Sequence, residues 1–200
     1  MREFILRARK APTAPTFSLD NLPAAGHMEV VAGCISNALF YANHVREATT
    51  INVVLEGGPE PPKTIRIDSA LLGSLDGFDE RSMAKMVQQT LEAGRGLSLR
   101  EEREAGGGIT IAKTAFEHLV QERSPESLFY LSKRGSDIRE LPLPENPTFV
   151  FSDYLSMPKK SEKYLSRLGA TAVSLGPRML FASHCIILVH NELDRRERQR

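Results

Sequence analysis

The stretch Ser174-Leu175-Gly176-Pro177-Arg178-Met179-Leu180-Phe181-Ala182-Ser183-His184-Cys185 decides how this chain is interpreted. It has the pattern of a strand end, a Gly-Pro turn and the first turn of a helix. Glycine permits close approach to the backbone, proline stiffens the bend, and a helix N-terminus has free amide groups. These features alone fit two interpretations, a plain strand-to-helix connection and a ligand site.

Strand-like and helix-like segments alternate over the rest of the chain. This alternation predicts an α/β fold, and the absence of a repeat or linker predicts a single domain over residues 1–200. We expect a surface loop over 99–108. We expect strands at 4–6, 50–55, 63–67, 128–131, 148–151 and 172–175, and helices at 28–41, 79–93, 111–121, 159–168 and 180–193.

The composition excludes several classes of protein. The chain has 200 residues, with 26 basic and 25 acidic side chains, so its net charge does not indicate a nucleic-acid binder. Cys34 and Cys185 lie far apart in sequence and form no disulfide framework, which suits a reducing cytoplasm. The longest apolar run near the end, 185–189, is much shorter than the roughly 20 residues that cross a membrane, so we expect no membrane association.

Common catalytic motifs are absent from the sequence. There is no P-loop, no Gly-x-Ser-x-Gly elbow and no His-Glu-x-x-His zinc motif, and we expect no metal. The run Gly106-Gly107-Gly108 lies in a charged segment and is interpreted as a flexible linker, so a nicotinamide-dependent oxidoreductase is not supported.

Two further strand ends carry polar residues. They are Leu131-Ser132 and Ser152-Asp153, each directly after a short apolar run. Ligands of α/β sheets bind at the carboxyl ends of parallel strands. Together with the end at Ser174, these segments are candidates for one shared pocket.

Several motifs give the chain a family resemblance that covers residues 2–194. It resembles the archaeal tRNA pseudouridine-54 N1-methyltransferases, which belong to the SPOUT class of S-adenosylmethionine-dependent RNA methyltransferases. The C-terminal stretch 175–185 is the most specific part. The other matching motifs are Gly26-His27-Met28-Glu29-Val30-Val31, Asn37-Ala38-Leu39-Phe40, Pro61-Pro62-Lys63-Thr64, Gly77-Phe78-Asp79-Glu80-Arg81 and Met157-Pro158-Lys159-Lys160.

This resemblance implies a mostly parallel sheet flanked by helices, a C-terminal trefoil knot and a homodimer with the active site near its interface. It implies that S-adenosylmethionine is the methyl donor and tRNA the partner, without a metal. Ser152 departs from the family, which usually has glycine there. The implied cofactor-binding residues are Leu131, Ser152, Leu175, Gly176, Pro177, Arg178, Met179, Leu180 and Cys185.

Asp20, on a loop before the first helix, is the candidate base or substrate anchor. The alternative is a turn residue that binds its own backbone. Asp79 and Glu80 are more simply explained as charges that complement the start of a helix. Cys185 is expected to be a small side chain against the cofactor and not a nucleophile.

Three basic clusters could hold RNA phosphates or could be ordinary solvated surfaces. Two alternatives to a tRNA methyltransferase also remain at this point. One is a pseudouridine N1-methyltransferase that acts on rRNA, and the other is a noncatalytic RNA-binding or ribosome-assembly factor with the same fold. The three basic clusters that could hold RNA phosphates are Arg7, Arg9 and Lys10; Lys159, Lys160, Lys163 and Arg167; and Arg195, Arg196, Arg198 and Arg200.

Overall fold

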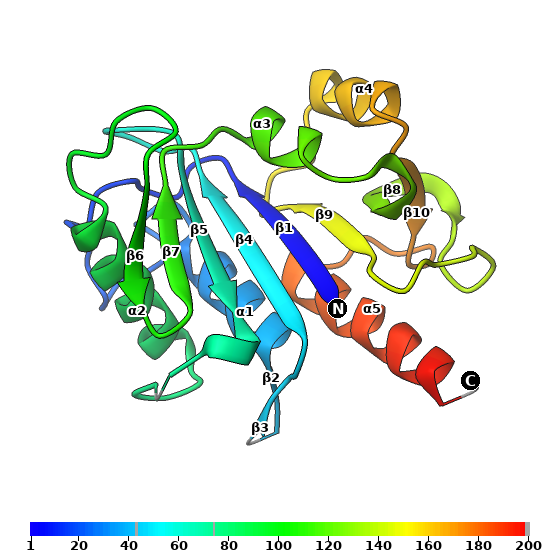
Figure 1. The fold of residues 1–200 in the computed structure, drawn as a ribbon, viewed down its shortest axis with the longest axis horizontal. Helices are drawn as coiled ribbons and strands as arrows, with labels where there is room; N and C mark the ends of the chain where they lie inside the picture. The colour runs from blue at the N-terminus through cyan, green and yellow to red at the C-terminus, as the bar shows by residue number, and fades with distance from the viewer. Residues whose placement is uncertain (43, 74, 199–200) are drawn as a thin grey trace.

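A computed structural model describes residues 1–42, 44–73 and 75–198, so Arg200 lies outside the described residues. An eight-stranded sheet runs through the molecule in the order β10-β8-β9-β1-β4-β5-β7-β6 (Figure 1). Its strands are β1 (Arg2–Ala8), β4 (Thr49–Leu55), β5 (Lys63–Asp68), β6 (Glu102–Gly106), β7 (Ile109–Ala112), β8 (Leu128–Asp137), β9 (Thr148–Ser152) and β10 (Thr171–Ser174).

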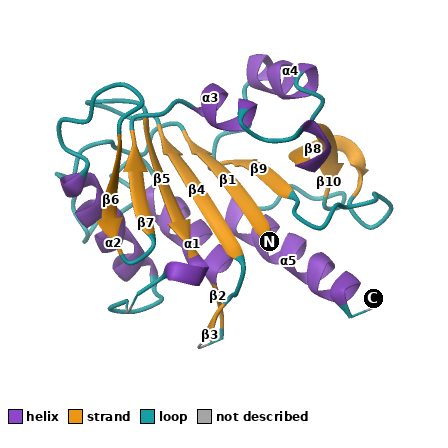
Figure 2. Cartoon of the chain, in the orientation of Figure 1, coloured by secondary structure: helices purple, strands orange, loops and turns teal. Residues whose placement is uncertain are grey.

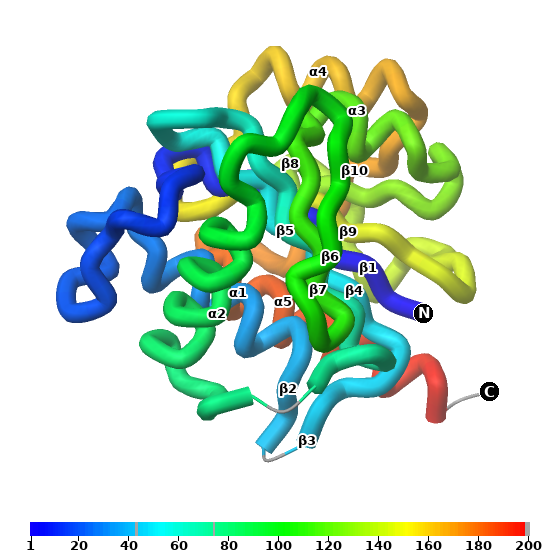
Figure 3. Tube along the Cα trace, turned by 60° about the vertical axis from the view of Figure 1, so that its left-hand side comes forward, coloured from blue at the N-terminus to red at the C-terminus, as the bar shows by residue number. Residues whose placement is uncertain are grey.

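Helices cover the sheet unevenly. Figures 2 and 3 show α1, α2 and α5 together on one side, with α3 and α4 at the top of the molecule. The strands β2 (Phe40–Tyr41) and β3 (His44–Val45) form a separate short pair. The helices are α1 (Met28–Leu39), α2 (Glu80–Ala93), α3 (Phe116–Gln121), α4 (Lys159–Arg167) and α5 (Ala182–Glu197).

The sheet is mostly parallel, as expected. β1 pairs in parallel with β4 and β9, and β8 pairs in parallel with β9 and β10. β5, β7 and β6 then extend the sheet with antiparallel pairings. The parallel strands therefore bring their carboxyl ends to one edge of the sheet, where the loops that follow them can form a site.

Two sequence expectations about the antiparallel extension are wrong. The expected loop over 99–108 contains β6, and the expected helix over 111–121 is the end of β7 followed by the short helix α3. β6 is an edge strand with exposed charged side chains, so its sequence lacks the alternation of apolar residues by which a strand is predicted. The helix expected to reach residue 41 ends at Leu39, because Phe40–Tyr41 pairs as β2.

Alternation along the strands produces two apolar layers. Phe4 and Leu6 of β1 face the core under α1, α2 and α5, whereas Ile5 packs in a second cluster with Phe116 of α3 and Leu165 of α4. This period of two residues is typical of a strand covered on both faces. Among the described residues, no helix is both long and apolar enough to cross a membrane.

A buried histidine joins β1 to α5. Arg2 Nη1 donates to His190 Nδ1 at 3.0 Å, so Nε2 carries the proton and donates to the Ala38 carbonyl at 3.0 Å. The pKa of His190 is lowered to about 3, first by burial and then by the charges of Arg46 and Arg2. The folded protein therefore holds His190 neutral at pH values where the unfolded chain binds a proton.

Acid is expected to destabilise the protein through His190. Since its folded pKa lies below its unfolded value near 6.5, stability is fully present above that value and decreases as the pH falls. Between pH 7 and pH 5 the loss is about 2 kcal/mol from this group. Urea unfolding of the wild type and His190→Gln at both pH values measures the difference. An equal pH dependence in the two proteins would refute this assignment.

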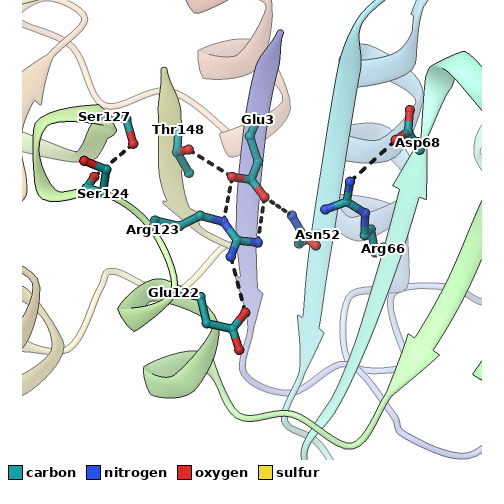
Figure 4. A network of polar contacts seen from close by, with 9 residues as sticks. All are labelled: Glu3, Asn52, Arg66, Asp68, Glu122, Arg123, Ser124, Ser127 and Thr148. Carbon is teal, nitrogen blue, oxygen red and sulfur yellow. Dashed lines mark hydrogen bonds and ion pairs between the residues drawn. The ribbon is translucent and has the colours of Figure 1, made fainter. Parts of the chain in front are cut away.

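A second polar network lies on the opposite face of the sheet (Figure 4). The Glu3 carboxylate is buried and accepts hydrogen bonds from Asn52, Thr148 and both Nε and Nη2 of Arg123, at 2.7–2.9 Å. Arg123 thereby fastens the chain after α3 to β1 at the centre of the sheet. The four hydrogen bonds satisfy a carboxylate whose burial would otherwise be costly.

Candidate functional site

The loop after β9 lies against the start of α1. The Ser152 hydroxyl donates to the Leu155 carbonyl at 2.5 Å, which folds the chain back directly after the strand. Two residues further on, the Tyr154 ring contacts the His27 ring at a tilt of 42°, with ring centroids 3.8 Å apart. The chain after β9 is therefore held between β1 and the N-terminal end of α1.

Asp153 is a buried carboxylate at this strand end. Its two oxygens accept the backbone amides of Arg9 and Leu155, each at 2.9 Å. Burial raises the pKa of Asp153 above its ordinary value, although these amides act to lower it. The side chain thus ties the loop after β1 to the loop after β9. It directly follows β9, and the sequence had already identified it as a polar residue at a strand end.

The turn after β10 is open on the side of Gly176. Gly176 has φ +125°, which side-chain-bearing residues rarely adopt, and a Cβ placed there would meet no atom within 4 Å. The Ser174 hydroxyl accepts the Gly176 amide and donates to the Gly176 carbonyl, both at 3.3 Å. Glycine is therefore required for backbone conformation here, and the space beside it is free for a ligand.

The remaining predicted residues of this segment divide into two groups. Leu131 on β8 and Leu175 after β10 are partly buried and pack against the main core. Pro177, Arg178, Met179 and Leu180 are exposed and continue to the start of α5. The segment therefore has an apolar inner side and an outer side that reaches solvent.

Gly33 of α1 marks the place where α2 and α5 begin side by side. A Cβ at Gly33 would lie 3.7 Å from Ser183 of α5 and 3.9 Å from the Glu80 carboxylate of α2. Asn37 Nδ2 also donates to the Ser183 carbonyl at 3.2 Å. The turn at 175–181 therefore leads into a helix that starts beside Glu80.

Asp20 lies near the start of α2. Its carboxylate accepts a 2.5 Å hydrogen bond from Arg81 Nη1, and Arg81 also donates to the Leu19 carbonyl. Both side chains of this ion pair are largely exposed. This ion pair therefore holds Asp20 beside the first turn of α2.

Asp79 has the helix-capping role that its sequence position indicated. It accepts the Ser82 amide at 3.1 Å and the Ser82 hydroxyl at 2.7 Å. These hydrogen bonds, the hydroxyl first, lower the pKa of Asp79. Glu80 is distinct from this cap, because its carboxylate reaches toward α5.

Cys34 of α1 and Cys185 of α5 lie close to each other, and both are free thiols. Burial raises the pKa of Cys185 to about 11. Burial also raises the pKa of Cys34, as do the nearby Cys185 and Asp153. Both thiols therefore stay protonated at neutral pH, which does not suit a nucleophile.

A hollow of about 440 Å³ lies elsewhere, on the open face of β4, β5 and β7 beside α3. Asn52, Arg66 and Arg123 line it, and none of the predicted site residues does. In the described ranges, no group of three or more His, Cys, Asp and Glu side chains could hold a metal ion.

Comparisons with known proteins agree on the class. Residues 1–198 match the family described as "Putative SAM-dependent RNA methyltransferase". A "Putative pseudouridine methyltransferase" of Photobacterium profundum is 40% identical over 195 residues, 97% of this chain and 98% of that protein. One from Vibrio parahaemolyticus is 41% identical over 198 residues, 98% of this chain and 100% of that protein.

A solved structure has the same fold. Archaeoglobus fulgidus Nep1 bound to S-adenosylhomocysteine has a TM-score of 0.63 to this chain, at 12% identity, with 96% of each chain covered. The chain therefore belongs to the family of S-adenosylmethionine-dependent RNA methyltransferases. The resemblance found in the sequence is confirmed at this level, although the two relatives about 40% identical come from the bacteria Photobacterium and Vibrio and not from archaea.

Proposed function

We propose that this chain transfers a methyl group from S-adenosylmethionine to N1 of pseudouridine at position 54 of tRNA. The observation that carries the proposal is the open turn at Gly176, which lies in the segment that most specifically resembles pseudouridine methyltransferases. Relatives about 40% identical over nearly the whole chain are named as putative pseudouridine methyltransferases, which supports the coarser part of the proposal. We treat residues 1–200 as one domain.

The residues near this turn fit S-adenosylmethionine. Leu131, Leu175 and Leu180 offer apolar contacts, and the space beside Gly176 accommodates a ligand. Cys185 is a protonated thiol, so no thiolate is present to attack a sulfonium. Ser152 is compatible with a ligand because its hydroxyl is already directed to Leu155. The wider set proposed to contact the cofactor is Leu131, Ser152, Leu175, Gly176, Pro177, Arg178, Met179, Leu180 and Cys185.

S-adenosylmethionine supplies the methyl group and its own leaving group, and the protein must position the acceptor and remove a proton. Asp20 is the proposed base, since its carboxylate is exposed and lies beside Arg81. Arg81 holds this carboxylate at the first turn of α2. The N1 proton of pseudouridine would pass to Asp20 as the N–C bond forms.

We also propose a homodimer that works in the cytoplasm and carries the trefoil knot of its class. The knot is proposed from the family resemblance. Arg196 of α5 donates to the carbonyls of Ile138 and Leu141 at 2.6 and 2.8 Å, so α5 packs against the segment after β8. Two free thiols suit a reducing compartment. The dimer is supported by exposed apolar side chains along the start of α5, namely Met179, Leu180, Phe181, Ile187 and Leu188.

Leu188→Arg is expected to convert the dimer to a monomer. Leu188 is 40% exposed on α5, and a charge placed within an apolar interface would be desolvated without a partner. Light scattering at micromolar concentration measures the mass. Leu71→Arg is the control, because Leu71 is 68% exposed on the short helical turn Ser69–Leu71 after β5. A monomeric wild type, or a dimeric Leu188→Arg protein, would contradict the proposed interface.

The choice of RNA is tested with matched substrates. Mass spectrometry follows methylation of a tRNA that carries pseudouridine at position 54, the same tRNA with uridine there, and an rRNA hairpin with pseudouridine in its loop. We expect rapid methylation of the first RNA alone. Preferential methylation of the hairpin would support the rRNA alternative, and RNA binding without methylation of any of them would support the noncatalytic factor.

A further inference from the structure

The edge of the sheet near α4 carries a group of exposed basic side chains without carboxylate partners. We call this group the basic edge. None of its members forms an ion pair with another described residue, and all are exposed. Its residues are Arg9, Lys10, Lys159, Lys160, Lys163 and Arg167.

Basic residues elsewhere on the sheet often form ion pairs with carboxylates. Arg7 is an example close to the basic edge. Arg7, two residues before Arg9, binds Glu56 at 2.8 Å and Glu117 at 3.5 Å, and donates to the Ser161 hydroxyl of α4. Arg7 thus occupies the two acidic groups nearest to it, and Asp153 is engaged by backbone amides. These acids do not neutralise the basic edge.

The row of positive charges along one face of α4 is unfavourable for an isolated helix, although Glu162 in the first turn and Arg167 in the last turn complement the helix dipole. Lys159, Lys163 and Arg167 are spaced by four residues, so like charges lie next to one another on one face. Lys159 and Lys160 also lie at the helix N-terminus, where the helix dipole disfavours positive charge. An anionic partner placed over this face would relieve both effects.

The basic edge is held in a fixed position beside the candidate site. The Tyr164 hydroxyl donates to the Glu117 carbonyl of α3 at 3.3 Å, and Leu165 is fully buried beneath α4. Arg9 is fastened through its backbone amide to Asp153, directly after Ser152. A row of cations about one helical turn apart on a rigid support matches the regular spacing of phosphates along an RNA strand.

We infer that the basic edge binds the phosphates of the RNA strand that flanks the methylated nucleoside. This inference rests on the proposed function, because it places the RNA between the basic edge and the turn at Gly176. The contacts are electrostatic and do not depend on base sequence. They therefore contribute affinity and orientation, while the residues around Gly176 and Asp20 act at the target nucleoside.

Lys160→Glu/Lys163→Glu tests the inference by fluorescence anisotropy with labelled tRNA from 50 to 200 mM salt. We expect affinity to fall roughly tenfold or more, and the slope of log K against log salt to become shallower by about 0.7–0.9 for each lost phosphate contact. Lys85→Glu/Arg95→Glu is the control with the same charge change, because both side chains are exposed and already paired, with Asp76 and Glu92. Its affinity and salt slope should stay close to those of the wild type.

Two further measurements separate this inference from the proposed function. Both double variants should keep the thermal shift with S-adenosylmethionine and should methylate a pseudouridine trinucleotide, which has few phosphates to bind, as well as the wild type does. If the wild type binds tRNA through the basic edge but methylates no RNA, the proposed function fails and the RNA surface stands. Unchanged tRNA affinity and salt slope in Lys160→Glu/Lys163→Glu overturns the inference. So does unchanged tRNA binding combined with lost binding to phosphatidylserine vesicles, which would assign the basic edge to a membrane surface.

Discussion

Gly176→Val is expected to abolish methyl transfer and the rise in melting temperature that S-adenosylmethionine produces, while most of the fold remains. Gly176 has φ +125° and precedes Pro177, so a β-branched residue is strained there whatever the space around it. The open volume beside it would be filled by the valine methyl groups. Binding of the cofactor is lost first and turnover follows.

Gly96→Val is the matched control for strain alone. Gly96 also has a positive φ, +69°, with no atom within 4 Å of the Cβ position, and it lies after α2. Strain is expected to cost each variant roughly 1–3 kcal/mol. Thermal melts with and without S-adenosylmethionine compare the two. If folded Gly176→Val keeps a normal ligand-induced shift, Gly176 is an ordinary turn glycine outside the site.

Arg123→Met is expected to lower the free energy of unfolding by about 3–5 kcal/mol, because it leaves the Glu3 carboxylate buried without its cationic partner. The Arg123 side chain is 18% exposed and that of Glu3 only 9%. Urea unfolding at pH 7 measures the loss. Arg139→Met serves as the control, since Arg139 pairs with Asp137 on the surface and should have little effect.

The double variant Glu3→Gln/Arg123→Met shows whether charge is the cause. Removing both charges avoids an unpaired buried carboxylate, so part of the lost stability should return. If the double variant is as unstable as Arg123→Met, the loss comes from the packing of the arginine side chain. A single variant as stable as the wild type would mean that the network in Figure 4 contributes little.

Periodicity predicted the parallel half of the fold well and the antiparallel extension poorly. The helix expected from 79 is α2, capped by Asp79, because an amphipathic pattern and a capping residue occur together there. β6 carries Glu102, Arg103 and Glu104 on a sheet edge, so its sequence resembles a charged loop. The strand order cannot be derived from periodicity, since it depends on contacts between segments distant in sequence.

The site was partly accessible to sequence reasoning. The Gly-Pro turn and the family resemblance identify Gly176 as a candidate cofactor-binding residue. The structure adds the positive φ that requires glycine at this position. The sequence identifies Asp153 as a polar residue at a strand end, but its burial and its hydrogen bonds to the amides of Arg9 and Leu155 depend on how the loops fold over it. The approach of Glu80 to Ser183 across Gly33 depends on how three helices pack, and no local pattern encodes it.

The most direct test of the central claim is transfer of a labelled methyl group. The purified protein is incubated with S-adenosylmethionine bearing a trideuterated methyl group and with RNA containing pseudouridine at one position, and the nucleosides are then separated by mass spectrometry. We predict a trideuteromethyl group on N1 of pseudouridine, with none on RNA in which uridine replaces it. The absence of label from pseudouridine, with a folded protein that binds S-adenosylmethionine, would contradict the account.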